Sequence, residues 1–130
     1  MSLPEWLVKA GASDTGGAYE LIQETRAIEG GPAPHVHRER DEGFLVLEGR
    51  YRFIRGHEET EVGEGAFVFV PRGIRHTFRT LAAPSRVLIV VAPAGLDGYF
   101  REMAEGLAAG RSAPDIMLEL SARFDTHPVP

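Results

Sequence analysis

The sequence contains no cysteine among its 130 residues, and this absence excludes two kinds of structure. No disulfide framework can hold the chain together, and no thiolate can bind zinc. Any metal site must therefore use histidine, aspartate or glutamate side chains.

Blocks of positive charge and long apolar runs are also missing, which limits the expected partners and location. The formal net charge is −5 and there is no block of lysine and arginine, so we expect no nucleic-acid partner. No apolar run approaches the ~20 residues of a membrane span. Residues 1–6 lack the basic and apolar regions of a signal peptide. These features predict a cytoplasmic protein with no membrane partner.

What the sequence does contain is a series of short β-patterned segments. Glycine (15) and proline (9) recur between them, which is typical of an all-β sandwich or small barrel. Segments 43–48 and 66–70 are apolar on both faces, which predicts strands buried on both sides.

The ends of the chain follow different patterns. Apolar residues at helical spacing in 96–107 and 117–124 predict two C-terminal helices, with Gly110 ending the first and Ser112 capping the second. We expect both helices to pack outside the barrel and to bind nothing. The domain then has three parts: an N-terminal arm at 1–17, a barrel at 18–93 and a helical extension at 94–130.

Apolar side chains in the N-terminal arm and on the two-sided strands also favour self-association. Leu3, Trp6 and Leu7 are expected to cover a sheet edge or a subunit contact, and we assign them no chemistry. Together with the two-sided strands they predict a homodimer.

The strongest chemical signal is a pair of histidines one residue apart, His35 and His37. On a strand both imidazoles point to one face, and Glu42 follows closely. Two imidazoles with a nearby carboxylate suit a borderline metal ion. The pair alone fits solvated histidines at a strand end equally well, so the interpretation depends on whether another segment completes the site.

A second motif supplies that segment. Residues 35–49 read H-x-H-x4-E-x6-G, residues 65–76 read G-x5-P-x-G-x2-H, and 15 residues separate them. Over residues 18–92 the chain resembles the cupin superfamily, specifically its small single-domain members, in both signature motifs. The family's second motif usually ends in asparagine four residues after its histidine, where this chain has Thr80. That asparagine is not a metal ligand, so the departure does not affect the expected site.

The resemblance implies a cupin-type double-stranded β-helix, or jelly-roll barrel, around one divalent transition metal ion. The implied ligands are His35, His37, Glu42 and His76. The metal's identity stays open among Fe, Mn, Ni, Co, Cu and Zn. Chains of this kind are similar to quercetinase-like dioxygenases, which implies a small aromatic or enol-type substrate, with Glu42 serving as catalytic base as well as ligand.

The aromatic residues of the barrel predict the character of the substrate pocket. We expect the pocket to be lined by Phe44, Val46, Tyr51, Phe53 and Phe78. The orientation of Phe67 and Phe69 is left open. An apolar lumen poor in lysine, glutamine and asparagine favours an aromatic or enol-like small molecule over a sugar phosphate.

Two other functions are compatible with the same residues. The ion could act only as a Lewis acid in an isomerase, cyclase or decarboxylase, or the chain could be a non-catalytic cupin that binds a small molecule. His57, in a polar turn, and His127, in the C-terminal tail, are weaker ligand candidates. The charged residues beside the ligands are expected to be solvated or to hydrogen-bond a ligand; they are Arg38, Arg40, Asp41, Arg72 and Arg75.

Overall fold

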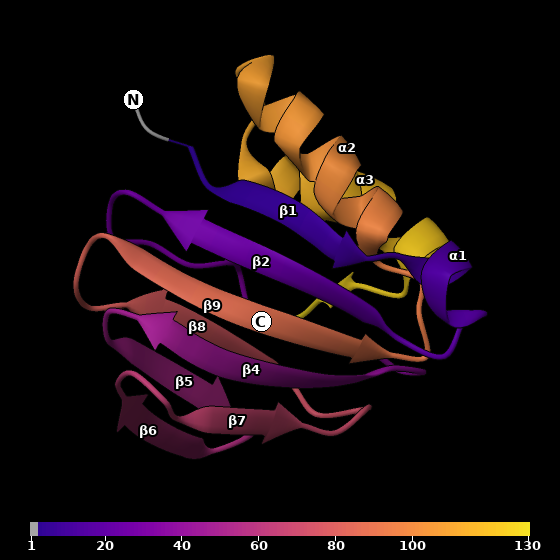
Figure 1. The fold of residues 1–130 in the computed structure, drawn as a ribbon. Helices are drawn as coiled ribbons and strands as arrows, with labels where there is room; N and C mark the ends of the chain where they lie inside the picture. The colour runs from indigo at the N-terminus through magenta and orange to yellow at the C-terminus, as the bar shows by residue number, and fades with distance from the viewer. Residues whose placement is uncertain (1–2) are drawn as a thin grey trace.

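Two antiparallel five-stranded sheets form the body of the protein in a computed structural model, which describes residues 3–130 (Figure 1). The first sheet has the order β1-β2-β9-β4-β7 and the second the order β10-β3-β8-β5-β6. The strands are β1 (Glu5–Ala10), β2 (Glu20–Arg26), β3 (His35–Val36), β4 (Asp41–Glu48), β5 (Tyr51–Arg55), β6 (Glu58–Val62), β7 (Phe67–Val70), β8 (His76–Thr80), β9 (Ser85–Ala92) and β10 (His127–Pro128). The helices are α1 (Ala12–Thr15), α2 (Asp97–Ala108) and α3 (Ala113–Phe124). The expected all-β fold with two C-terminal helices is confirmed.

The core lies between the inward faces of the two sheets. Alternate residues of β9 are buried, as the period of a strand requires, and Ile22 of β2 and Phe44 of β4 face the same interior. Burying each such side chain contributes roughly 1.5–3 kcal/mol. Gly49 and Gly65, with φ of 92° and 86°, occupy tight turns between strands, where a residue with a Cβ would be strained.

The outward face of the first sheet differs from expectation. Leu45 and Leu47 of β4 are each 37% exposed, and Phe67 and Phe69 of β7 are 58% and 46% exposed. The prediction that these strands are buried on both sides is therefore wrong for the single chain. The ring of Phe67 lies directly over Gly43, where a Cβ would collide with it.

The apolar outward face gives the expected homodimer a testable location. We predict that the protein elutes with twice the chain mass, and that Phe67→Glu converts it to a monomer because a charge cannot be buried there unpaired. Light scattering after size exclusion measures both masses. A Glu58→Lys variant, on an exposed edge strand, is the control, and a wild-type monomer would contradict the prediction.

The segment at 1–17 carries a strand of the first sheet. β1 pairs with β2, with Trp6 opposite Glu24, and thereby covers the edge of β2. The first two residues of this segment lie outside the described part of the chain.

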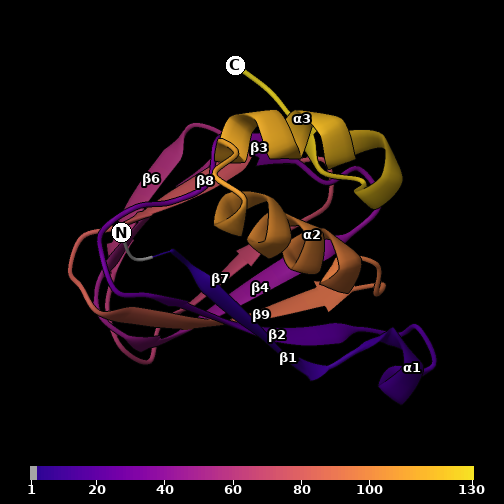
Figure 2. The ribbon, with the colours of Figure 1, turned by 90° about the horizontal axis from the view of Figure 1, so that it is seen from above.

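The C-terminal helices lie across one open side of the sandwich, seen from above in Figure 2. Ser112 caps α3 by accepting a hydrogen bond from the backbone N–H of Asp115, as its position predicts. The start of α2 is held by Glu20 of β2, which is fully buried. Its carboxylate accepts hydrogen bonds of 2.7–2.8 Å from the backbone N–H groups of residues 95, 96 and 97. Among the described residues, none of the helices combines the length and apolar character needed to cross a membrane.

Candidate metal centre

Four buried side chains converge between the sheets. His35, His37, Glu42 and His76 each offer a ligand atom, and these atoms all lie within 4.8 Å of one another. His35 sits directly opposite His76 in the pairing of β3 with β8, and His37 follows β3. Glu42 comes from β4 of the other sheet, so the cluster exists only when the two sheets face each other. The four side chains are between 2% and 8% exposed.

Backbone carbonyls orient all three imidazoles in the same manner. The Nδ1 atoms donate hydrogen bonds of 2.8 Å from His35 to Ala33, 2.9 Å from His37 to Asp125, and 2.9 Å from His76 to Ile74. Because a carbonyl oxygen only accepts, each Nδ1 must carry its proton, which leaves each Nε2 free to present a lone pair. This is the arrangement in which histidines bind metal ions.

The contacts around Glu42 fit either a proton or a metal ion between its carboxylate and the histidines. Its Oε1 lies 2.9 Å from Nε2 of His37 and 2.9 Å from Nε2 of His76. Nε2 of His37 is buried and has no aligned hydrogen bond despite that short distance. Neutral imidazole lone pairs and a carboxylate oxygen repel at this separation unless a proton or a metal ion lies between them. The donor set of three nitrogens and a carboxylate therefore fits a divalent transition metal ion.

Electrostatics keep the ligands close to the forms that a metal requires. Burial, with His76 and His37 close by, lowers the pKa of His35 to about 3, so this imidazole stays neutral. Burial alone would raise the pKa of Glu42, but His37 and His76 outweigh it and hold that pKa well below the usual value. Burial opposes charge on His37, yet the Glu42 carboxylate raises its pKa. A proton on His37 must therefore be released when metal binds.

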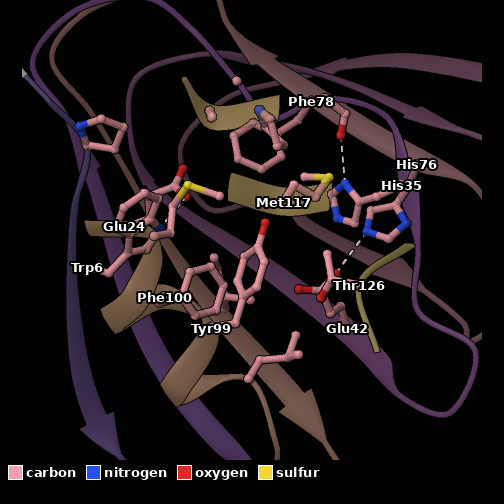
Figure 3. Close-up of a pocket in the computed structure, with 18 of the residues that line it drawn as sticks. Trp6, Glu24, His35, Glu42, His76, Phe78, Tyr99, Phe100, Met117 and Thr126 are labelled. Carbon is pink, nitrogen blue, oxygen red and sulfur yellow. Dashed lines mark hydrogen bonds and ion pairs between the residues drawn. The ribbon is translucent and has the colours of Figure 1, made fainter. Parts of the chain in front are cut away.

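A cavity of about 220 Å³ opens beside the cluster (Figure 3). His35, His37, Glu42 and His76 form one part of its wall, and most of the remaining wall is apolar. Of the five predicted pocket residues, Phe44 and Phe78 line it.

The other three predicted pocket residues lie deeper in the core, which corrects that expectation. Val46 and Tyr51 are fully buried and Phe53 is 2% exposed, and none of the three lines the cavity. Val46 faces the same way as Phe44 but lies one pleat repeat farther along β4. Tyr51 and Phe53 belong to β5, one strand beyond β8, and the Phe53 ring packs behind Phe44 and Phe78 at 5.0 and 5.4 Å between centroids.

Several cavity residues were not predicted, because their segments were expected to have only a packing role. Tyr99, Phe100, Met103 and Leu107 of α2, Ala113 and Met117 of α3, and Trp6 of β1 all line the cavity. The helices are therefore part of the cavity wall, whereas they were expected only to pack outside the barrel. In Figure 3 the hydroxyl of Tyr99 points toward the cavity interior. The ring centroid of Phe100 is 5.6 Å from that of Trp6.

Asp125 connects the end of α3 to the loop that carries His37. Its carboxylate accepts hydrogen bonds of 2.9 Å from the backbone N–H groups of Arg38 and Glu39, and Arg40 pairs with it at 3.1 Å. The tail is also ordered around this point: Nε2 of His127 lies 3.1 Å from Asp125, and β10 pairs with β3. His127 and Arg40 thus support the site indirectly.

The remaining weak candidates lie apart from the cluster. His57 is exposed in the turn before β6. Arg72 pairs with Asp41 at 3.1 Å, and Arg75 donates to the backbone carbonyl of Pro130 at 2.7 Å. None of these four belongs to the group of possible metal ligands found among residues 3–130.

Comparison with known proteins agrees with this geometry. The family model described as "Cupin domain" matches residues 24–91. An uncharacterized protein of Streptomyces coelicolor is 38% identical over 60 residues, which cover 46% of this chain and 54% of that protein. The chain spans about half the length of the curated relatives it matches.

Solved structures with low sequence identity share the fold. KdgF from Halomonas sp. has a TM-score of 0.63 at 17% identity, covering 69% of this chain and 78% of that chain. A protein of Thermotoga maritima described as a predicted oxalate decarboxylase has a TM-score of 0.64 at 15% identity, covering 69% and 80%. At these identities the likeness concerns the fold alone.

Proposed function

Because this chain belongs to the cupin domain family, we propose that it is a metal-dependent dioxygenase acting on a small aromatic or enol-type substrate. The observation that carries the proposal is the placement of three Nδ1-anchored histidines and one carboxylate in the wall of a buried, mainly apolar cavity. Such a donor set leaves one or two positions of an octahedral ion free.

The chain's own residues would have distinct roles in this reaction. The three histidines hold the ion, which supplies Lewis acidity and redox capacity when bound. Glu42 uses Oε1 toward His37 and His76, while its Oε2 has no hydrogen bond within the described chain. In the proposed reaction that oxygen would accept the proton of an enol substrate.

The cavity walls favour a flat apolar substrate. Trp6, Phe78 and Phe100 present aromatic rings to the cavity, and Met103 and Met117 provide adaptable apolar contacts. A mainly apolar wall of this kind limits the access of water to the reacting groups.

Oxygen consumption tests the proposal. Protein loaded separately with Fe, Mn, Ni, Co or Cu is screened against flavonols and β-diketones, and one O2 should be consumed per substrate molecule converted. Turnover without O2 would assign the site to the isomerase, cyclase or decarboxylase class instead. A metal-loaded protein that consumes no O2 with any of these substrates, and converts none, would favour a non-catalytic binding role.

Tyr99 is expected to orient the substrate by donating a hydrogen bond. Its hydroxyl has no hydrogen-bond partner within residues 3–130, and burial raises its pKa above the usual value, so it stays protonated. Tyr99→Phe should lower kcat/KM roughly 3- to 10-fold for the substrate with the fastest O2 uptake, since one neutral hydrogen bond is lost. Tyr19→Phe, at an exposed position, is the control. Unchanged kcat/KM in Tyr99→Phe would contradict this role.

A further inference from the structure

An ion pair lines the same cavity and has no part in the metal centre. Glu20, Ile22, Glu24 and Arg26 form the inward row of β2, and Glu24 and Arg26 both contribute to the cavity wall. In Figure 3 Glu24 and Trp6 lie on the other side of the cavity from His35 and His76. The cavity therefore has charged groups at two separate places, with an apolar wall between them.

The carboxylate of Glu24 is already occupied at both oxygens. Oε1 accepts a hydrogen bond of 2.7 Å from Nε1 of Trp6, and Oε2 accepts one of 3.0 Å from Nε of Arg26. Glu24 is only 3% exposed. Its role toward a ligand is therefore indirect: it fixes the guanidinium of Arg26 and the indole of Trp6.

The guanidinium of Arg26, in contrast, is only partly used. Within the described part of the chain, its two terminal nitrogens make no hydrogen bond, although the side chain is only 12% exposed. It lies 5.8 Å from the centroid of Phe78, a cavity residue. Arg26 also lines a neighbouring pocket of about 70 Å³ with Leu3 and Pro4, so it lies between the cavity and this second pocket.

In a purely structural ion pair, the two terminal nitrogens of the arginine would be expected to donate two parallel hydrogen bonds to the partner carboxylate. Here the contact through Nε alone leaves the planar fork of terminal N–H groups available, and a carboxylate matches that fork with two parallel hydrogen bonds. An uncharged ligand would leave these donors poorly paired in a mostly apolar wall.

We propose that Arg26 recognises a carboxylate, and that the cavity takes an aryl carboxylic acid whose acid group lies at Arg26 and whose aromatic body lies along the apolar wall. Only the orientation of the opposite end toward His35, His37, Glu42 and His76 rests on the proposed function. The acid-recognition site itself requires no metal.

A matched pair of probes tests this assignment. Isothermal titration calorimetry compares 3-phenylpropionate with 3-phenylpropanamide, which have the same shape and differ in charge, using protein in EDTA and protein loaded with zinc. The wild-type protein should prefer the carboxylate at least ~10-fold, as charge-assisted hydrogen bonds require. Arg26→Met should bind the two probes with about equal affinity, and Arg26→Lys should retain part of the preference for the carboxylate. Arg79→Met, at an exposed arginine on β8, should keep the wild-type preference.

Glu24→Gln is expected to strengthen binding of the carboxylate probe, whereas Arg26→Met is expected to weaken it. It retains an acceptor for Trp6 and removes the negative charge that competes for Arg26, so the carboxylate probe should bind several-fold more tightly. Circular dichroism shows whether Arg26→Met folds. If it does not fold, Glu24→Gln still tests the proposal. Tighter binding is not expected if the ion pair only stabilises the sheet.

Three results would overturn the inference: equal affinity of the wild-type protein for both probes, no binding of either at millimolar concentration, or weaker carboxylate binding in Glu24→Gln. Its failure is separable from that of the proposed function. A carboxylate preference in EDTA together with no O2 uptake would refute only the dioxygenase, and O2 uptake without a carboxylate preference would refute only the role of Arg26.

Discussion

His76→Ala is expected to weaken metal binding by more than ~100-fold, because even the loss of a group that only orients a ligand costs about 10–100-fold. His76 is the ligand that the second motif supplies, and its Nε2 faces the same oxygen of Glu42 as does Nε2 of His37. Without it, only two imidazoles and one carboxylate remain. Elemental analysis of purified protein and competition with a chelator measure the change.

The matched control is His57→Ala, which removes an exposed histidine outside the cluster. It should retain the wild-type metal content. The free energy of unfolding of both variants in EDTA separates loss of a ligand from loss of the fold. Full metal content in His76→Ala would show that His76 is not a ligand. The absence of a transition metal from the wild-type protein would favour a metal-free binding module instead.

The metal affinity should also depend on pH in a definite direction. The Glu42 carboxylate raises the pKa of His37, so the proton competes with the metal at this residue as the pH falls. The pKa of His35, lowered to about 3 chiefly by burial, keeps that imidazole out of the competition above this pH. Affinity should therefore rise as the pH is raised through the pKa of His37 and then level off.

Asp125→Ala is expected to destabilise the fold by roughly 3–5 kcal/mol. Asp125 has a φ of 48°, a left-handed conformation that costs alanine about 1–2 kcal/mol. Its carboxylate also accepts hydrogen bonds from Arg38, Glu39 and Arg40, and at these partly exposed contacts each bond contributes about 0.5–1 kcal/mol net. The backbone carbonyl of residue 125 accepts a hydrogen bond from Nδ1 of His37. Because the substitution strains the backbone that positions this carbonyl, metal affinity should also fall about 10-fold.

Two variants separate these contributions. Asp125→Asn tolerates the left-handed conformation and keeps an acceptor, so it should cost only about 1–2 kcal/mol. Asp115→Ala, at an exposed aspartate in the first turn of α3, is the control for charge. Chemical denaturation with and without metal gives the values. A change below about 1 kcal/mol in Asp125→Ala would show that the network contributes little.

Lowering the pH should reduce the folding stability that the Asp125 carboxylate contributes. The hydrogen bonds from Arg38 and Glu39 outweigh burial and lower the pKa of Asp125. A carboxyl whose pKa is lower in the folded state stabilises the fold above its unfolded pKa and loses that contribution as the pH falls through its folded pKa. The stability difference between wild type and Asp125→Asn should therefore shrink on acidification.

The histidine ligands could be predicted from the sequence because local rules govern them. Alternation along an extended segment places His35 and His37 on one face, and the resemblance of both motifs to the cupin pattern implied Glu42 and His76. The capping of α3 by Ser112 was also predictable, since a cap depends on residues only three positions apart.

The cavity and the solvent-facing surface were decided by tertiary structure. Helical spacing shows that Tyr99 and Met117 face something apolar, but not that they face a cavity shared with β1 and β2. Likewise, two-sided apolarity does not distinguish Phe67, which is exposed in the single chain, from a core residue. The role of Arg26 could not be predicted from the sequence either. Alternation places it on the inward row of β2, but only the packing of Trp6 and Glu24 leaves its terminal nitrogens open, because contacts between segments distant in sequence leave no periodic signal.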